Sequence, residues 1–275
     1  MFLRTSRYCV LFQGEFVEKK VTINMDVDAR PKFSKEQKEE IERYWDEMQR
    51  KGWKMRPDPL YRLLDFSVRN GILDLHLGLT DYKEYMGTNV RHPEWFLEYG
   101  DEVMSNAVSV SAVTETRDEK IIIERRSQNV GESRGYYHTK PSGHPHPPEG
   151  IFGGVYSQAK QELGIEKSDI TRIACVGLVR SVRSRKPELM FKIKLGISSS
   201  EVERRPKRDA YEFEELLYLP RDPESLARWL IENFEKTVSL GHGTILIFGF
   251  QSFGTEWLRE VKKEMDSLNK ISAVE

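Results

Sequence analysis

Residues 140–165 constrain the fold more than any other stretch, because a loop rich in proline and glycine leads there directly into a helical pattern. The loop occupies 141–148, and the pattern ends at Gly164, a residue type that commonly terminates helices. Strand-like runs precede and follow the segment. A loop that enters a helix between strands presents backbone N–H groups and carboxylates together, which suits a phosphate–metal complex. The segment therefore indicates such a site in a chain of mixed α and β structure.

The first hundred residues contain two helix start signals. Ser34 is expected to cap a helix over 35–51, with Gln37 placed for a capping box. Thr80 is expected to cap a short helix that stops at Gly87. These helices, with the strands described next, predict a small α+β module over residues 1–104.

Strands in this module are predicted from alternating apolar residues and from turn residues. Asn70 and Gly71 separate two strand-like runs, which is the strongest short signal for a β-hairpin. Gly14 is expected to form a turn between two earlier strands. The predicted strands cover 8–12, 16–27, 61–69 and 72–79.

Residues 105–275 form a second predicted domain, rich in strands with embedded helices. Asp222 is expected to cap a helix over 223–236, and a final amphipathic helix is predicted over 255–268. The apolar run 244–250 fits either a strand or a helix. The predicted strands cover 107–116, 120–126, 136–140, 170–182, 188–197 and 211–219.

Charge and cysteine content exclude several classes of protein. The chain carries 43 basic and 44 acidic residues, so it has no global attraction to nucleic acid or to an anionic membrane. Cys9 and Cys175 lie far apart in apolar runs and indicate buried thiols in a reducing compartment. The start of the chain does not fit a secretory signal, and the run 244–250 is too short to span a bilayer. We expect a soluble protein of the cytoplasm or the nucleus, without nucleic-acid or membrane partners.

The loop and helix resemble the Nudix box. Gly143, Glu149, Glu162, Gly164 and Ile165 match its first glycine, its first glutamate and its end. The flanking residues 126–135 and 142–145 are similar to the RS-x-x-V-x-E-x-x-G…GGHPEP pattern of one Nudix branch, which includes enzymes that hydrolyse UDP-glucose and UDP-galactose. Residues 77–89, together with Trp95, resemble the LGLT-x-Y-x-x-x-x-GTN segment of the same branch. Two motifs in the same order make the match more specific than the box alone.

The resemblance implies a fold and an activity. The fold is a Nudix-like α/β/α sandwich with a mixed sheet, in the α/β (α+β) class, preceded by the small N-terminal α+β module. The implied activity is that of a metal-dependent nucleotide-sugar diphosphatase, which uses water to cleave UDP-glucose into UMP and a sugar 1-phosphate. The implied partner is therefore a small nucleotide sugar, and the oligomeric state is left open.

The box departs from the family pattern where its carboxylates should be densest. Ser157 and Gln158 stand at the Arg-Glu pair, and Gln161 and Glu162 stand at the Glu-Glu pair. Positions 158, 161 and 162 lie on one helix face, and the resemblance implies that they hold Mg²⁺ or Mn²⁺ against a diphosphate. Glutamine keeps an oxygen but loses the charge, so we expect weak metal binding. The candidate metal ligands are Glu162, Gln158 and Gln161.

The candidate catalytic residues are Glu162 and Glu188, since Glu188 begins a strand that can point into the same site. A histidine cluster at 138, 144 and 146 near Glu149 offers a less favoured transition-metal site. Arg125 and Arg126 end a strand beside the loop, and only one of them should face the site because strand side chains alternate. The candidate substrate-binding residues are Arg126, Lys140, Gly143, His144, Tyr82 and Asn89.

Two functional hypotheses follow. The first is an active Nudix-type hydrolase of a nucleoside diphosphate sugar, weakened by the lost glutamates. The second is a catalytically inactive Nudix-fold protein that binds a nucleotide sugar or a protein partner. A purely structural domain is a third, less specific alternative.

Overall fold

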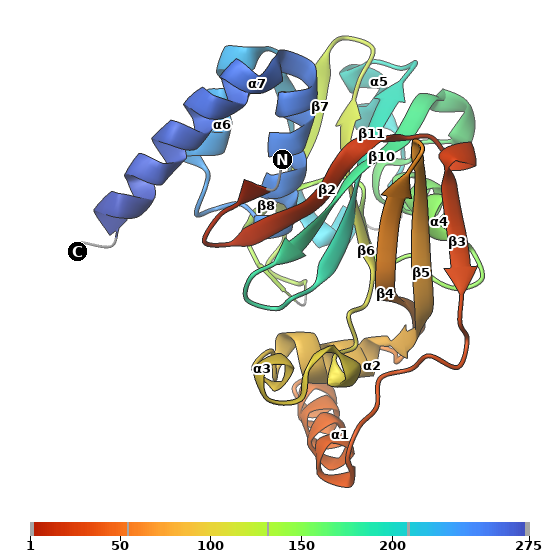
Figure 1. Ribbon diagram of the computed structural model, residues 1–275. Helices are drawn as coiled ribbons and strands as arrows, with labels where there is room; N and C mark the ends of the chain where they lie inside the picture. Colours follow the sequence, from red (N-terminus) through yellow and green to blue (C-terminus); the bar gives the residue numbers. More distant parts are fainter. Residues whose placement is uncertain (1–2, 54, 131, 208–209, 273–275) are drawn as a thin grey trace.

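The computed structural model describes residues 3–53, 55–130, 132–207 and 210–272. Gly131, which belongs to one of the matched motifs, lies outside these residues. The described chain contains a large mixed sheet and a second, three-stranded sheet (Figure 1). No helix in the described part of the chain is both long enough and apolar enough to cross a membrane.

The large sheet combines parallel and antiparallel pairs. Its main path runs β1-β2-β10-β11-β6-β7-β12, with β8 paired to β7 and β9 paired to β6. β11 pairs with β6 in parallel, whereas β10 pairs antiparallel with both β2 and β11. The bounds are β1 Leu3–Arg4, β2 Tyr8–Phe16, β6 Ser109–Glu115, β7 Lys120–Arg126, β8 Tyr137–Thr139, β9 Ser142–Gly143, β10 Ile170–Ser181, β11 Pro187–Leu195 and β12 Phe213–Pro220.

Helices cover both faces of the large sheet. On one face, α4 (Ile151–Leu163) packs through Val155 against a core that includes Val110. On the other face, α6 (Pro223–Glu232) and α7 (Ser239–Ser272) pack against a core that includes Val113. α7 consists of two helical segments that meet at Gly254, whose backbone is not helical. The strand β6 thus sends alternate side chains into two cores, as expected for a central strand between helical layers. The predicted α/β/α sandwich with a mixed sheet is confirmed.

The second sheet has the order β3-β5-β4, with bounds Val21–Met25, Ile72–Asp81 and Pro59–Arg69. The predicted hairpin is confirmed: β4 and β5 pair antiparallel around Asn70 and Gly71, which both have positive φ. This backbone suits the right-handed twist of the strands and is tolerated by asparagine and glycine. The three strands lie beside the α4 face of the large sheet (Figure 1).

One of the two helix caps predicted in the N-terminal part is confirmed, and the other is wrong. α1 (Lys35–Arg50) begins at Ser34 with the predicted capping box to Gln37. α2 (Tyr82–Tyr85) is capped by Asp81, so the cap expected at Thr80 is wrong by one residue. The reason is that the Asp81 carboxylate accepts the backbone N–H of Glu84, whereas the Thr80 hydroxyl donates to the Glu84 side chain. The remaining short elements are η1 Glu18–Lys20, η2 Met86–Val90, α3 Trp95–Tyr99, η3 Asp101–Val103, η4 Lys167–Asp169, α5 Ser199–Arg204 and η5 Ala210–Glu212.

The tertiary structure corrects one local prediction and decides another that was left open. The turn expected at Gly14 is absent, since β2 continues from Tyr8 to Phe16 along β10, with a shift of the pairing register between Gln13 and Phe16. The run 244–250, left open between strand and helix, is helical and lies inside α7. The division between residues 104 and 105 stays a prediction, although the pairing of β2 places residues of the first predicted domain in the sheet of the second.

Candidate functional site

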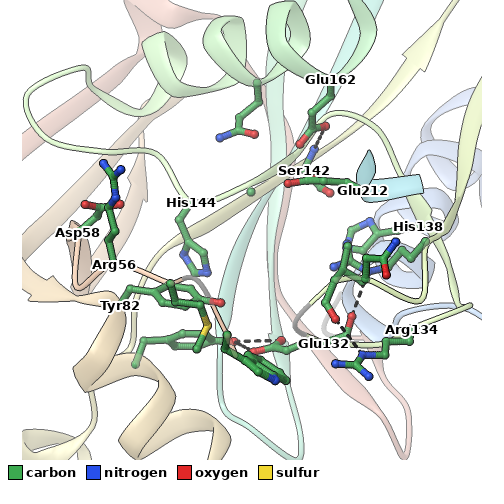
Figure 2. Close-up of a pocket in the computed structure, with 18 of the residues that line it drawn as sticks. Arg56, Asp58, Tyr82, Glu132, Arg134, His138, Ser142, His144, Glu162 and Glu212 are labelled. Atoms are coloured by element: carbon green, nitrogen blue, oxygen red, sulfur yellow. Dashed lines mark hydrogen bonds between the residues drawn. The ribbon is translucent and has the colours of Figure 1, made fainter. Parts of the chain in front are cut away.

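A cavity of about 940 Å³ opens where the turn after β8, the helix α4 and the N-terminal module meet. Figure 2 shows Glu162, Ser142 and Glu212 at one end, Tyr82 at the other end, and His144 between them. The lining comes from the segment between α1 and β4, α2, the loop after β7, the turn at 142–146, α4, the start of β11 and η5. Both sequence segments that resemble the Nudix branch therefore contribute to one cavity.

The turn at β9 lies directly against α4. A Cβ atom built on Gly143 would lie 2.8 Å from Oε1 of Gln158, so the position admits no larger side chain while Gln158 keeps its place. Gly143 also pairs with Val110 of β6, which fixes the turn to the sheet. Gly164 ends α4 in the left-handed conformation, as expected for a glycine at this position.

Glu162 is buried on α4 and faces the cavity end of the turn. The backbone N–H of Ser142 donates to Oε2 of Glu162 at 3.0 Å (Figure 2). The side chain is almost fully buried, and this burial raises its pKa, while the Lys140 ammonium beside it acts in the opposite direction. Glu162 is therefore held in position by the same turn that Gly143 forms.

The ammonium of Lys140 lies among three carboxylates. Its Nζ atom is 3.1 Å from Glu124 Oε2, 3.1 Å from Glu162 Oε2 and 3.5 Å from Glu212 Oε2. Burial by itself lowers the pKa of Lys140, but the carboxylates around it raise the pKa above its ordinary value. Burial also raises the pKa of Glu124. Arg126 pairs with the second oxygen of Glu124 at 3.3 Å, which adds another positive charge to the cluster.

Glu188 is a buried carboxylate with one oxygen that lacks a hydrogen-bond partner among the described residues. The side chain is buried at the start of β11 and lines the cavity. Its Oε2 accepts a hydrogen bond from the hydroxyl of Ser109 at 2.9 Å. Its Oε1 is buried without a hydrogen-bond partner among the described residues. A buried oxygen of this kind can accept a hydrogen bond from water or from a ligand.

The opposite end of the cavity is aromatic. The ring of His144 lies 5.1 Å from that of Tyr85 and 6.1 Å from that of Tyr82, and the two tyrosine rings are 5.8 Å apart. His144 Nδ1 bonds the carbonyl of Val108 at 2.9 Å, and burial lowers the pKa of this histidine well below its ordinary value. A neutral imidazole therefore donates to Val108 and presents an acceptor nitrogen elsewhere.

The two arginines that end β7 point in different directions. Arg126 lines the cavity, and its guanidinium donates to the carbonyl of Glu132 at 3.2 Å. Arg125 instead pairs with Glu214 and Glu215. The alternation expected for neighbouring strand residues is the reason for this difference.

Other predicted site residues are placed outside the cavity lining. Asn89 is buried, donates to the carbonyl of Ser184 at 2.8 Å and accepts from the N–H of Asn106 at 2.9 Å. Lys140 lies beneath the cavity and is fully buried, so its charge acts on the site through Glu162. Gln161 is partly exposed on α4 and is not among the described lining residues, whereas Gln158 is.

The histidine cluster is distributed over different partners. His138 is buried in the lining and bonds Thr139, while His146 bonds the carbonyl of Pro59 at 3.1 Å. Glu149 accepts a hydrogen bond from Ser157 on the exposed side of α4. Within the described residues, no group of three or more His, Cys, Asp or Glu side chains is arranged to hold a metal ion.

Comparison with known proteins agrees with the two motifs. No family model matches the chain. The chain is 30% identical over 161 residues to Nudix hydrolase 9 of Arabidopsis thaliana, a match that covers 47% of this chain and 51% of that protein. It is 35% identical over 89 residues to uridine diphosphate glucose pyrophosphatase NUDT22 of Mus musculus, covering 30% and 29% of the two chains. This chain is a relative of the Nudix hydrolases. The matches span about half of the first relative's length and less than a third of the second's.

Some solved protein structures are similar to about half of this chain. DR0079 from Deinococcus radiodurans has a TM-score of 0.39 and 14% identity, covering 52% of this chain and 82% of that one. The MutT protein from Methanosarcina mazei has a TM-score of 0.37 and 20% identity, covering 53% and 94%.

The donor set of this Nudix relative does not fit a divalent ion. The carboxylates of Glu124, Glu162 and Glu212 converge, but they converge on the Lys140 ammonium at 3.1–3.5 Å. Mg²⁺ binds oxygen at about 2.1 Å and prefers anionic ligands. On α4, the box position that lines the cavity beside Glu162 carries the neutral amide of Gln158.

Several residues of the site were missed by the sequence analysis. Glu124 could have been found, because it continues the apolar strand run 121–123 as a charged residue at a buried position. Lys186 and Glu212 line the cavity from segments distant in sequence. Their placement depends on the pairing of β11 and β12 with the sheet, for which no local pattern gives a signal.

Proposed function

We propose that the cavity binds a nucleoside diphosphate sugar of the UDP-glucose class. The observation that supports this is the convergence of two segments that are far apart in sequence and similar to the same Nudix branch. Tyr82 and Tyr85 come from one segment, and Ser142, Gly143 and His144 come from the other. The name of the mouse relative, a UDP-glucose pyrophosphatase, supports the same ligand class.

The chemistry of the lining suggests how such a ligand would lie. The aromatic end with Tyr82 and Tyr85 suits a base or sugar ring. Arg126 and Lys186 line the cavity and suit the diphosphate, because both are cations and a guanidinium can bind two phosphate oxygens at once. The unpartnered Oε1 of Glu188 can accept a hydrogen bond from a ligand N–H or hydroxyl.

Binding, rather than metal-dependent hydrolysis, is the function that this donor set supports best. Gln158 lacks the negative charge that a metal ligand would contribute at this position, and Glu162 already pairs with Lys140. Hydrolysis remains the second candidate, and Glu188 favours it. In that reaction water attacks one phosphorus, the bridging P–O bond breaks, and a buried carboxylate near the cavity accepts the proton of the water.

Calorimetry and product analysis test the proposal together. UDP-glucose should bind wild-type protein at micromolar concentration, and UMP should not accumulate in the same sample. The Gln158→Glu/Gln161→Glu double variant and a Glu188→Gln variant are run beside it. If wild-type protein forms UMP and Glu188→Gln stops that reaction while still binding UDP-glucose, the second candidate replaces the first. If saturating UDP-glucose produces neither heat nor product, the ligand class is wrong.

A further inference from the structure

A buried ion-pair cluster lies directly beneath the cavity, made of Lys140, Glu124, Glu162, Glu212 and Arg126. We propose that the Lys140 ammonium is the resident cation of this site and that it excludes divalent metal ions from the carboxylates. The proposal concerns the cavity of the proposed function, but it depends on the ion pairs and on no property of the nucleotide.

The cluster has the arrangement of a cation site built from separate elements. Glu124 comes from β7, Glu162 from α4 and Glu212 from η5, and Lys140 enters from the connection between β8 and β9. All three carboxylates approach one Nζ atom at 3.1–3.5 Å. The side chains of Lys140, Glu124 and Glu162 are at most 2% exposed, so bulk water does not solvate their charges. A buried ammonium needs such partners, because an isolated one is strongly disfavoured.

A metal ion and the ammonium compete for the same oxygen atoms. Oε2 of Glu162 contacts Lys140 Nζ and accepts the N–H of Ser142, so both of its interactions are already made within the protein. A divalent ion that bound this atom would lie within a few ångströms of the ammonium, and the two positive charges would repel each other in a poorly solvated region. Entry of the metal therefore requires that Lys140 leave the cluster.

The cations and carboxylates of the cluster are nearly balanced without a metal. Lys140 and Arg126 supply two positive charges beside three carboxyl groups, and Arg126 reaches the other oxygen of Glu124 at 3.3 Å. The neutral amides of Gln158 and Gln161 agree with this balance, since a singly charged cation needs fewer anionic partners than Mg²⁺. Removing the lysine would leave a cavity of carboxylates that a divalent ion could fill.

Titration with Mn²⁺ alone, followed by electron paramagnetic resonance of the free ion, tests this inference. Wild-type protein should show no Mn²⁺ site that depends on Glu162. Lys140→Met should bind one Mn²⁺ ion at least tenfold more tightly than wild-type protein binds Mn²⁺. Lys160→Met is the matched control, because Lys160 lies on α4, pairs with the exposed Glu166 and should leave Mn²⁺ binding as in wild type. A wild-type site that Glu162→Gln removes overturns the proposal, as does a folded Lys140→Met variant that binds Mn²⁺ no better than wild type.

A second measurement on wild-type protein covers the case in which Lys140→Met does not fold. Lysine ammonium protons in a buried ion pair exchange slowly, so ¹H–¹⁵N spectra should contain a Lys140 NH₃⁺ resonance, assigned by its loss in Lys140→Arg. This resonance should persist in 10 mM Mg²⁺. Its disappearance or a large shift on addition of Mg²⁺ overturns the proposal. Neither measurement contains a nucleotide, so their failure is distinguishable from a failure of UDP-glucose to bind.

Discussion

Gly143 lies so close to Gln158 that a methyl group added to the glycine would meet the Gln158 amide at 2.8 Å. This contact joins the turn at β9 to the helix α4 and thereby forms one wall of the cavity. The neighbour is the far end of a flexible side chain, which can move. The contact therefore controls the position of the Gln158 side chain more than it controls the stability of the fold.

Comparison of two alanine variants tests this view of the wall. Gly143→Ala should leave the free energy of unfolding within about 1 kcal/mol of wild type and weaken UDP-glucose binding by displacing Gln158. Gly154→Ala should destabilise the protein by about 1–3 kcal/mol, because its Cβ would lie 2.8 Å from the Cα atom of Pro145, which cannot rotate away. Urea unfolding measures both effects. Equal losses of stability in the two variants would contradict the explanation.

Arg126 and Arg125 form a matched pair for the anion contact. Arg126→Ala should lower the affinity for UDP-glucose about tenfold or more and reduce stability by about 2 kcal/mol, because Glu124 loses one of its partners. Arg125→Ala removes only a partly exposed pair with Glu214 and Glu215, so it should change stability by less than about 1 kcal/mol and leave affinity unchanged. Calorimetry and urea unfolding of both variants provide the check. A stronger effect of Arg125→Ala on binding would rule out the assigned orientation.

Tyr82 should contribute to recognition of the base or sugar and not of the phosphates. Tyr82→Ala is expected to weaken UDP-glucose binding by about 1–3 kcal/mol, the range found for stacking of a base on an aromatic ring. Binding of inorganic diphosphate should be unchanged. Tyr156→Ala on α4, whose ring contacts Lys167, is the control for loss of a tyrosine elsewhere. Equal losses for UDP-glucose and diphosphate would move the aromatic contact away from the nucleoside.

UDP-glucose binding should not depend on a divalent ion. If Lys140 supplies the positive charge beneath the cavity, the increase in melting temperature caused by UDP-glucose should be the same in EDTA as in 5 mM Mg²⁺. Differential scanning fluorimetry at several ligand concentrations measures this. A shift seen only with Mg²⁺ would show that the metal takes part in binding.

His242 is expected to make the free energy of unfolding depend on pH in the acid range. Its imidazole is buried, accepts from the hydroxyl of Tyr8 at 2.9 Å and donates to the carbonyl of Leu230 at 3.2 Å. Burial lowers its pKa to about 3, whereas the unfolded chain binds this proton near pH 6.5. The stabilising contribution is therefore complete above about pH 6.5 and decreases as the pH falls towards 3, by at most about 1.4 kcal/mol per pH unit.

A His242→Gln variant isolates this contribution from that of the carboxylates. The variant should be less stable than wild type at pH 7, but its free energy of unfolding should fall less steeply between pH 6.5 and pH 4.5. Urea unfolding at half-unit intervals of pH gives both slopes. Parallel slopes would mean that another group carries the acid dependence.

Local sequence patterns were sufficient where neighbouring residues decide the structure. The capping box of Ser34 and Gln37 and the turn at Asn70 and Gly71 involve contacts within a few residues, so their residue types specify them directly. The helix that carries Glu162 was predicted from its apolar spacing and from Gly164 for the same reason. The matched motifs also indicated that Glu162 and Gly143 belong to one site.

The sequence by itself determined the sandwich class, the Ser34 cap, the hairpin at Asn70 and Gly71, and the residues of the Nudix-like loop and helix. Only the tertiary structure decided that β2 joins the large sheet, that Arg126 faces the cavity and that Asn89 does not. It also decided that Lys140, predicted as a substrate contact, lies among Glu124, Glu162 and Glu212. The physical reason is that an ion pair depends on distances of 3–4 Å between atoms, and strand pairing over long sequence separations sets those distances.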